Sequence, residues 1–372
     1  MSRSTPVSVR CFLCLLRVCA LTGGTSGWSD LLHVSFAVIL GTAVAAIVVL
    51  VNFTAGMKEL SQEKSPVEAL AISAFFGLMF LLMWINLMLC YVLSRRRVGS
   101  LLCRIGRTLD EMADMPGYEE SVQLLHREVA WLMVTTLVMT VVTVVVASYM
   151  TYTFDCTTTM RCFVLQTYAV AFDVFHVSFV LNILKFAYIG LHVNCGFRII
   201  NTSLEDFLNK ESLLQEHKVL DGLMRIQDDL AQLFTDTTKV MSYEIISVMT
   251  CGAVASVSMW LILIIKISTN DLSNIWPMLI LYTFGGFIAI VVPSELIHHL
   301  LTTLARSRDL LLVGARRRPK LGYQLSVFRE TVGRDLDTLG DLGLFRLRRS
   351  TILSATATIV TYIIVMVQFR YS

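Results

Sequence analysis

The stretch TILSATATIVTYIIVMVQF, residues 351–369, contains no charged residue and approaches the ~20 residues that an α-helix needs to cross the hydrocarbon of a bilayer. Its polar residues recur at alternating spacings of three and four, which keeps them on one side of a helix with 3.6 residues per turn. This side, the polar stripe, consists of Thr351, Ser354, Thr358, Thr361, Val365 and Gln368. Five of its six members are polar, so the stretch predicts a membrane-spanning helix with one polar side.

The polar stripe has two explanations. Hydroxyls and amides that face lipid lack hydrogen-bond partners, so the stripe needs either protein or water beside it. It can pack against other helices of the same chain, since Ser and Thr also bond carbonyls of their own helix. Alternatively, it lines a water-filled path, and Gln368 favours this explanation because a primary amide one turn beyond Val365 suits a narrow apolar gate.

The composition is that of a polytopic membrane protein. Of the 372 residues, 55% are hydrophobic and 16% are charged, and the mean hydropathy is +0.67. The net charge of +3 gives no indication of a nucleic-acid partner. We expect an all-α fold with seven transmembrane helices, at residues 31–53, 67–93, 129–150, 162–191, 243–267, 275–297 and 351–369.

The basic residues predict the orientation in the membrane. Between these spans, 25 of the Lys and Arg residues fall on one side of the membrane and four on the other. Because cytoplasmic loops are enriched in Lys and Arg, the N-terminus is expected in the cytoplasm and the C-terminus outside the cell. A G-protein-coupled receptor, the alternative with seven spans, requires the opposite orientation.

The end of the sequence resembles a known family. Thr361-Tyr362, then five apolar residues, then Gln368-Phe369 is similar to the motif of insect gustatory receptors, and it lies in the seventh apolar segment after a long basic loop. The resemblance implies a tetrameric, ligand-gated cation channel whose seventh helix lines the central pore, with Val365 and Gln368 at or next to the gate. The expected pore residues are Thr358, Thr361, Val365, Gln368 and Phe369.

The predicted spans and their orientation, together with the roles that the resemblance implies, predict an organisation in four parts. Residues 1–30 form a cytoplasmic segment, and residues 31–297 form a ligand-binding bundle of six transmembrane helices with cytoplasmic extensions. Residues 298–350 form a cytoplasmic loop and anchor region, and residues 351–372 form the pore-lining helix with a short extracellular tail. The expected partners are a small-molecule tastant, membrane lipid, and further copies of the chain or other gustatory receptors, in the plasma membrane of a sensory neuron.

A ligand pocket is expected in the outer half of the bundle. Asp173 lies within the fourth span, where a carboxylate is costly, and shares a helical side with Gln166 and His176. It either pairs with a neighbouring helix or faces a water-filled pocket that binds a ligand. Aromatic residues supply flat apolar walls for such a pocket. The candidate ligand-contacting residues are Tyr168, Asp173, Trp260 and Tyr282.

Other polar and small residues within the spans carry weaker expectations. Lys185, Glu244 and Glu295 lie close enough to the predicted span ends to reach water, so little functional role is expected of them. Gly285-Gly286 in the sixth span predicts a close helix approach or a point of movement. Cys156 and Cys162 flank one outer loop and form either a disulfide or two free thiols.

A bitter or other plant-derived compound is the first expectation for the ligand. A fructose-like sugar is the second expectation. It ranks lower because related sugar receptors commonly have an acidic residue where this chain has Ile363. An odorant receptor of the same superfamily and a secondary transporter that uses Asp173 are further alternatives, although the repeat symmetry common in transporters is not found. We find no nucleophile elbow, phosphate loop or metal-ligand spacing, so no catalytic residue, metal or cofactor is expected.

Overall fold

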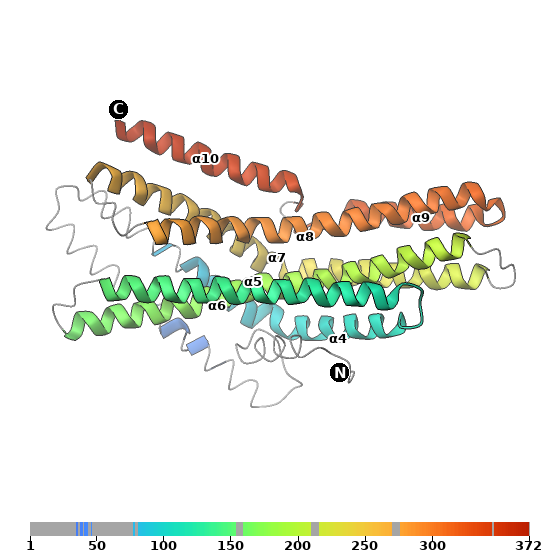
Figure 1. Ribbon diagram of the computed structural model, residues 1–372, viewed down its shortest axis with the longest axis horizontal. Coiled ribbons are helices and arrows are strands. Elements are labelled where there is room, and N and C mark those ends of the chain that lie inside the picture. The colour runs from blue at the N-terminus through green and yellow to red at the C-terminus, as the bar shows by residue number, and fades with distance from the viewer. Residues whose placement is uncertain are drawn as a thin grey trace.

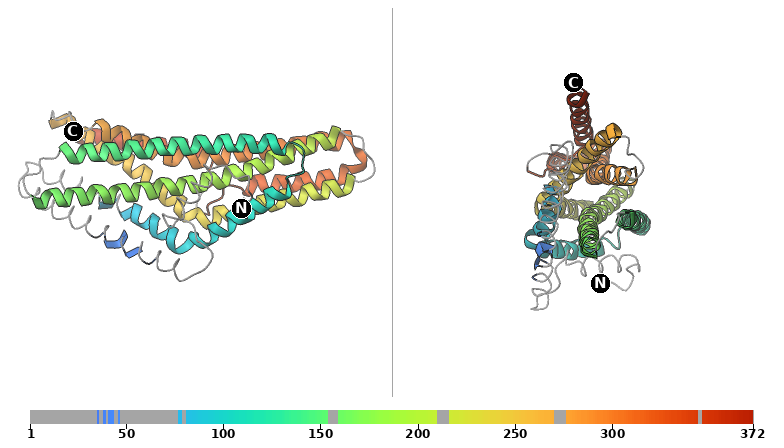
Figure 2. Two further views of the ribbon diagram at one scale, coloured as in Figure 1. Left: turned by 60° about the horizontal axis from the view of Figure 1, so that its bottom comes forward. Right: turned by 90° about the vertical axis from the view of Figure 1, so that its left-hand side faces the viewer.

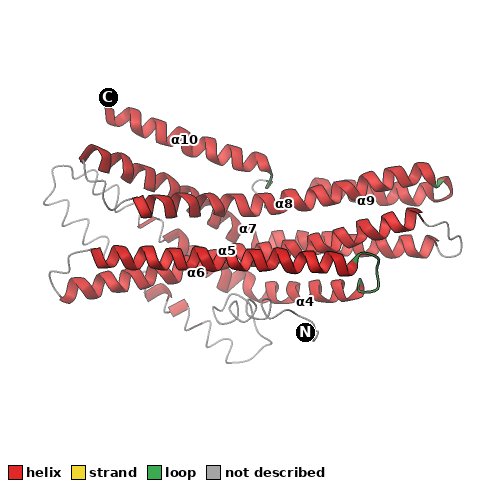
Figure 3. Ribbon diagram, in the orientation of Figure 1, coloured by secondary structure: helices red, strands yellow, loops and turns green. Residues whose placement is uncertain are grey.

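The computed structural model describes residues 35, 38–39, 41–43, 46, 77–78, 81–153, 159–209, 216–269, 276–343 and 346–371. Within these residues the secondary structure is helical apart from an isolated bridge between Asp341 and Arg346 (Figure 3). The all-α prediction is therefore confirmed for the described part of the chain. The helices are η1 (Cys90–Ser94), α4 (Arg95–Glu111), α5 (Tyr118–Thr153), α6 (Thr159–Asn209), α7 (Glu216–Thr269), α8 (Trp276–Arg317), η2 (Pro319–Leu321), α9 (Gly322–Thr338) and α10 (Arg349–Tyr371).

Four helices are long and apolar enough to cross a membrane within the described ranges. Their candidate spans are Tyr118–Val146, Phe179–Asn209, Glu216–Trp260 and Thr283–Arg317, and a shorter apolar helix covers Arg349–Val365. These five segments overlap the third to seventh predicted spans, with boundaries that differ by up to 27 residues. The predicted span at 31–53 lies largely outside the described residues, as does the first part of the span at 67–93, residues 67–76. Residues 81–89 of that second span are helical and lead into η1 and α4.

The helices extend much farther than the predicted spans. The 51 residues of α6 and the 54 residues of α7 correspond to about 77 and 81 Å at 1.5 Å per residue, against a hydrocarbon thickness of ~30 Å. Figure 1 shows α5 to α8 running along the long axis of an elongated bundle, with α9 folded back beside the last part of α8. The region 298–350 is accordingly built largely of helix, from the end of α8, η2 and α9.

The exposure of the side chains separates a lipid-like surface from a buried core. On α5 the apolar side chains of Trp131, Leu137 and Val145 are 63%, 65% and 59% exposed. Such a surface is typical of a helix that faces acyl chains. By contrast, α6 contacts α4, α5, α7 and α8, and most of its residues from Phe179 onward are buried. Figure 2 shows this central position of α6 when the bundle is viewed from its end.

A tight turn after α9 directs α10 back along the bundle. Gly340 has a φ of +83°, and a Cβ there would lie 2.8 Å from Cγ2 of Ile297, so the position requires glycine. The backbone N–H of Leu347 donates to Gly340 O at 2.9 Å, and Nε of Arg346 donates to Leu339 O at 3.3 Å. These bonds satisfy carbonyls at the end of α9 and position the first turn of α10 beside α8.

Candidate functional site

One side of α10 packs against the rest of the chain and the other side is exposed. Ile352, Ala355 and Ile359 pack against the buried core, and the helix contacts α7 and α8. Five members of the polar stripe have exposed side chains: Ser354, Thr358, Thr361, Val365 and Gln368. Figure 1 shows α10 at the periphery of the bundle. Ser354, Thr358, Thr361 and Val365 are thus not buried against other described helices of the chain, and the exposed surface of α10 also includes the apolar residues Leu353, Val360 and Ile364.

The exposed hydroxyls of the polar stripe bond their own helix. Thr358 Oγ1 donates to Ser354 O at 2.8 Å, and Thr361 Oγ1 donates to Ala357 O at the same distance. This arrangement leaves oxygen lone pairs on the exposed surface while removing the cost of an unbonded hydroxyl proton. The assignment of these residues, with Val365, Gln368 and Phe369, to a pore remains a prediction, and the side chain of Phe369 lies outside the description.

An ion pair attaches the start of α10 to α8. Arg349 donates from Nε and Nη2 to the two carboxylate oxygens of Glu295, both at 2.9 Å. A bidentate pair of this kind fixes orientation as well as distance. Glu295, whose side chain is 31% exposed, reaches water as expected, and it also has a specific partner in the helix that carries the polar stripe.

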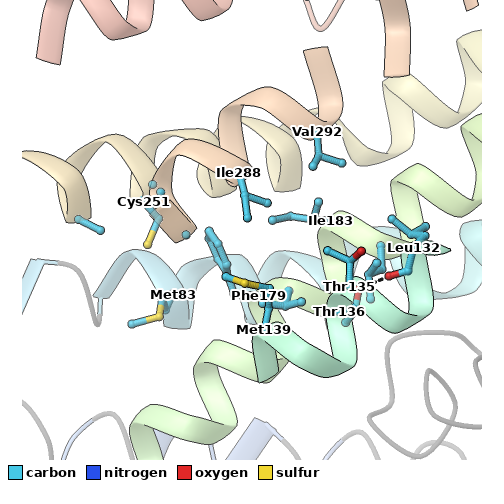
Figure 4. Close-up of a pocket in the computed structure, with 16 residues that line it drawn as sticks. Met83, Leu132, Thr135, Thr136, Met139, Phe179, Ile183, Cys251, Ile288 and Val292 are labelled. Atoms are coloured by element: carbon cyan, nitrogen blue, oxygen red, sulfur yellow. Dashed lines mark hydrogen bonds between the residues drawn. The ribbon is translucent and has the colours of Figure 1, made fainter. Parts of the chain in front are cut away.

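A cavity of about 110 Å³ lies between α5, α6, α7 and α8. Met83 closes it from the helix that precedes η1, and Figure 4 shows side chains from all these elements around it. The lining is apolar except for a few groups, chiefly the hydroxyls of Thr135 and Thr136. The Thr136 hydroxyl donates to Leu132 O at 2.7 Å. The cavity thus offers volume to a small molecule but very few hydrogen-bonding groups.

Of the four candidate ligand-contacting residues, Trp260 has a described side chain, and it is not among the described residues that line this cavity. Trp260 is half-buried and packs against the core. Tyr168 and Asp173 belong to α6 and Tyr282 to α8, but their side chains lie outside the description. Asp173 precedes the cavity residue Phe179 by six residues, which is about 9 Å along the helix. The assignment of these four residues to a ligand pocket therefore stays a prediction.

The cavity borders a close crossing of α7 and α8. A Cβ on Gly286 would lie 2.4 Å from Gly252 O, and a Cβ on Gly252 would lie 2.7 Å from Gly286 O. The predicted close approach is therefore confirmed, and Gly252 is the partner. A Cβ on Gly285 would meet no atom within 4 Å. Gly286 thus permits the helix contact, whereas Gly285 leaves space in the cavity wall.

A buried polar network lies where α6 and α7 meet the helix around η1. Lys185 Nζ and Glu244 Oε2 are 2.7 Å apart. Lys185 Nζ also lies 3.3 Å from Ser94 Oγ and 3.3 Å from Cys90 Sγ, the two ends of η1. Asn86 Nδ2 donates to Glu244 O at 3.0 Å. A π-helical turn often marks a functional position, and here it brings two polar side chains onto one ammonium group.

This network corrects the expectation that Lys185 and Glu244 reach water at the span ends. Both residues are buried, with side chains 0% and 2% exposed. The sequence feature that could have predicted this buried network is the regular spacing of polar residues within apolar spans. Asn86, Cys90 and Ser94 recur every four residues, and Asn182 precedes Lys185 by three, so each set shares one helical side.

The other predicted features lie partly beyond the described residues. Cys156 lies outside the described ranges, as does the side chain of Cys162, so the disulfide alternative stays a prediction. In the part of the chain that the structure describes, no group of three or more His, Cys, Asp or Glu side chains is arranged to hold a metal ion.

Fold and site together define a helical, multi-pass membrane protein with an apolar internal cavity and an exposed polar helix face. A sequence model described as "7tm Chemosensory receptor" matches residues 13–372, so the chain belongs to this family of insect gustatory and olfactory receptors. No curated protein matches the chain.

Two solved structures of one olfactory receptor share the fold. Insect olfactory receptor OR5 from Machilis hrabei in complex with eugenol aligns with a TM-score of 0.75 at 13% identity, covering 97% of each chain. The structure of OR5 from Machilis hrabei reported without a named ligand aligns with a TM-score of 0.73 at 13% identity, covering 98% of this chain and 100% of that one. The similarity shows a common helical fold over nearly the whole length.

Proposed function

We propose that the chain is a gustatory receptor subunit that forms a ligand-gated, nonselective cation channel in the plasma membrane of a sensory neuron. Four copies, or copies of this chain with other gustatory receptors, surround a central pore. The α10 helix of each subunit lines this pore. A small molecule that binds within the transmembrane bundle opens it.

The exposed polar face of α10 is the observation that carries this proposal. The hydroxyls of Thr358 and Thr361 lie on the exposed surface of α10, where contact with lipid would leave their remaining lone pairs without hydrogen-bond partners. If four subunits assemble around an axis, the copies of each residue form a ring, and the rings line a water-filled path. The apolar side chain of Val365 supplies a ring that closes such a path by dewetting.

The arrangement of the helix ends supports the proposed seven-span topology. Figure 1 shows the C-terminal end of α10 at the same end of the bundle as the end of α5 and the start of α8. The ion pairs Arg198–Glu128, Arg306–Glu205 and Arg318–Glu216 lie toward the other end, in the extensions of the long helices. An end rich in ion pairs is expected outside the hydrocarbon, in agreement with a cytoplasmic position. Membership of the family also favours a channel over a G-protein-coupled receptor or a secondary transporter.

The ligand is proposed to be a bitter or other plant-derived compound. It binds in the outer half of the bundle, near Tyr168, Asp173, Trp260 and Tyr282. The motif Thr361-Tyr362 to Gln368-Phe369 favours a gustatory over an olfactory receptor. Ile363, where sugar receptors commonly have an acidic residue, disfavours a fructose-like sugar. An olfactory function is the second candidate, because the OR5 structure that shares this fold contains eugenol.

Expression in a cell line with calcium imaging and whole-cell recording tests the proposal. We expect one or more compounds of a tastant panel to evoke a cation current that reverses near zero millivolts. Gln368→Ala is expected to alter conductance or ion preference, since it removes an amide from the proposed pore. A ligand response without any current, or a current that depends on G-protein signalling, would contradict a channel.

A further inference from the structure

We propose that the surface shared by the start of α4 and the middle of α7 binds an anionic phospholipid whose headgroup carries more than one negative charge. Arg96 and Arg97 lie on α4 directly after the second predicted span, and Lys239 lies on α7 just before the fifth. All three side chains are exposed. In the proposed orientation, this surface belongs to the cytoplasmic leaflet of the membrane.

The helices α4 and α7 run side by side in opposite directions at this place. At one end, Ser94 Oγ and Glu244 Oε2 both contact Lys185 Nζ, at 3.3 and 2.7 Å. At the other end, Arg104 Nη1 and Asp236 Oδ2 are 3.0 Å apart. The chain therefore advances from residue 94 to 104 on α4 while it runs from 244 back to 236 on α7, and residues 97 and 239 lie between the two contacts.

The basic side chains lie on the sides of the two helices that meet. Arg97 precedes Arg104 by seven residues, so both lie on the side of α4 that contacts α7. Lys239 and Tyr243 follow Asp236 by three and seven residues, so they lie on the side of α7 that contacts α4. Charges that are far apart in the sequence thus border one helix contact.

These charges lie at the depth of lipid headgroups. Leu93 and Tyr243 are 48% and 62% exposed at the ends of the two predicted spans, and they mark the edge of the hydrocarbon. Arg97 and Lys239 each lie four residues beyond this edge, which is about 6 Å along a helix. A bilayer has ~30 Å of hydrocarbon within a total of about 40–45 Å, so each headgroup layer measures about 5–8 Å. Both charges therefore reach the level of the lipid phosphates.

The local charge balance favours a ligand with several negative charges. Residues 93–100 and 236–243 contain one carboxylate, Asp236, and it pairs with Arg104. The charges of Arg96, Arg97 and Lys239 are therefore not neutralised within these two segments. An arginine binds phosphate through two parallel hydrogen bonds, and basic clusters beside a membrane attract anionic lipids.

The apolar neighbours of the basic residues favour a lipid over a soluble phosphate. Leu93 and the ring of Tyr243 are exposed on the hydrocarbon side of the charges, where they can contact the acyl chains of a lipid whose headgroup binds Arg97 and Lys239. A tyrosine at this depth also keeps its hydroxyl in the polar layer. A soluble phosphate would contact only the charged part of this surface.

A bound headgroup would connect α4 and α7 beside the buried polar network. Tyr243 directly precedes Glu244, the partner of Lys185, and α7 also contacts α10. We therefore expect the lipid to change the sensitivity of the channel to its ligand. This consequence rests on the proposed function, whereas lipid binding itself does not.

A binding assay tests the site without requiring channel activity. Full-length protein in phosphatidylcholine nanodiscs is titrated with fluorescent dioctanoyl phosphatidylinositol bisphosphate, and fluorescence anisotropy is measured against empty nanodiscs. We expect saturable binding that the unlabelled lipid displaces and dioctanoyl phosphatidylcholine does not. Each basic residue beside a membrane strengthens such binding about fivefold, so the double variant Arg97→Gln, Lys239→Gln should weaken it about 25-fold.

A second pair of adjacent arginines supplies the matched control. Arg316 and Arg317 are exposed at the end of α8, and Arg316 lies 19 residues beyond the sixth predicted span, which ends at residue 297. This distance is about 29 Å along the helix, well outside the headgroup layer. The double variant Arg316→Gln, Arg317→Gln removes the same charge and should leave the affinity unchanged.

Three results would overturn the proposal. The first is wild-type affinity in the folded Arg97→Gln, Lys239→Gln protein, and the second is an equal loss in both double variants, which would show a response to total charge only. The third is displacement by inositol trisphosphate at the same concentration as the unlabelled lipid, which would assign the surface to a soluble phosphate. If the first double variant does not fold, Lys239→Gln alone decides the question, with an expected loss of about fivefold.

Discussion

Lys185 Nζ lies 2.7 Å from Glu244 Oε2 in the interior of the bundle, with the two side chains 0% and 2% exposed. Ser94 Oγ and Cys90 Sγ lie 3.3 Å from the same ammonium group. A buried ion pair is costly to desolvate, and these two further contacts help to compensate the charge of Lys185, whereas Oε1 of Glu244 is buried without a hydrogen-bond partner among the described residues. The network therefore joins α6, which carries Lys185, to α7, which carries Glu244, and to η1. Each of the two charges is stabilised by the presence of the other.

Removal of either charge should destabilise the protein strongly. Lys185→Met leaves the Glu244 carboxylate buried without its partner, which typically costs about 3–5 kcal/mol. Fluorescence-detected gel filtration after heating should show a large loss of folded protein. The double variant Lys185→Met, Glu244→Leu should recover part of it, because neither charge then remains.

The exposed pair Arg104–Asp236, at 3.0 Å with side chains 44% and 37% exposed, supplies the control for this comparison. Arg104→Met should cost at most about 1 kcal/mol, since solvent screens the pair. Equal losses in Lys185→Met and Arg104→Met would show that the buried pair does not hold the helices together.

Two adjacent glycines should respond oppositely to the same substitution. Gly286→Ala forces a Cβ against Gly252 O at 2.4 Å, which should cost about 1–3 kcal/mol as the helices separate. Gly285→Ala meets no atom within 4 Å and should be neutral or stabilise by up to about 1 kcal/mol, because alanine favours helix. Thermal midpoints of the two variants measure the difference, and a more stable Gly286→Ala protein would refute the close crossing.

A buried carboxylate on α9 should make stability depend on pH. Burial raises the pKa of Asp335, which is 6% exposed, and the nearby Asp228 acts in the same direction, while Arg334 and Gln227 oppose it. A group with a raised pKa stabilises the fold below its unfolded pKa, and this contribution is lost as the pH rises through the folded value. At neutral pH the charged Asp335 is therefore unfavourable.

Asp335→Asn should consequently raise the thermal midpoint at neutral pH, and the gain should shrink as the pH falls toward about 4, the value for an unfolded aspartate. Asp337→Asn, at an exposed position on the same helix, should change the midpoint little at either pH. A gain for Asp335→Asn that does not vary with pH would exclude ionisation as its cause.

Cysteine substitution along α10 should reveal which side faces water in the assembled channel. With ligand present and a water-soluble thiol reagent outside, current block should recur at residues 358, 361, 365 and 368. Positions on the packed side, such as Ile359 and Ile363, should react little. Val365→Ser should raise the resting current, because a hydroxyl wets the proposed gate. Uniform inertness of the four stripe positions in a responsive channel would assign the stripe to subunit packing instead.

The sequence allowed the helical class and the polar side of α10 to be predicted, because both depend on local periodicity. It also predicted that Gly285-Gly286 marks a close approach, since small residues indicate helix contact in membranes. The partner, Gly252, was not predictable, because the pairing depends on how two helices cross. The contact between Lys185 and Glu244, which lie 59 residues apart, was not predictable either, because it also depends on how two helices pack.

Helix lengths and the level of the cavity were less predictable. Hydropathy identifies the part of a helix that contacts lipid. Beyond that part, α6 and α7 continue through amphipathic sequence, and hydropathy alone does not distinguish such helical sequence from a loop. The cavity arises where large side chains are absent, beside Gly285, and its volume depends on the surrounding helices.

The length of α8 has a thermodynamic consequence. Its 42 residues form a helix of about 63 Å, which carries Gly285 at the cavity, Glu295 at the attachment of α10, and a final segment against α9. In the proposed receptor, a cytoplasmic protein or modification that bound preferentially to one state of this helix would change the affinity for an outer ligand, and the ligand would change the binding of that protein or modification by the same factor. The detection threshold of the proposed receptor would then be adjustable from inside the cell, without any change in the residues that recognise the ligand.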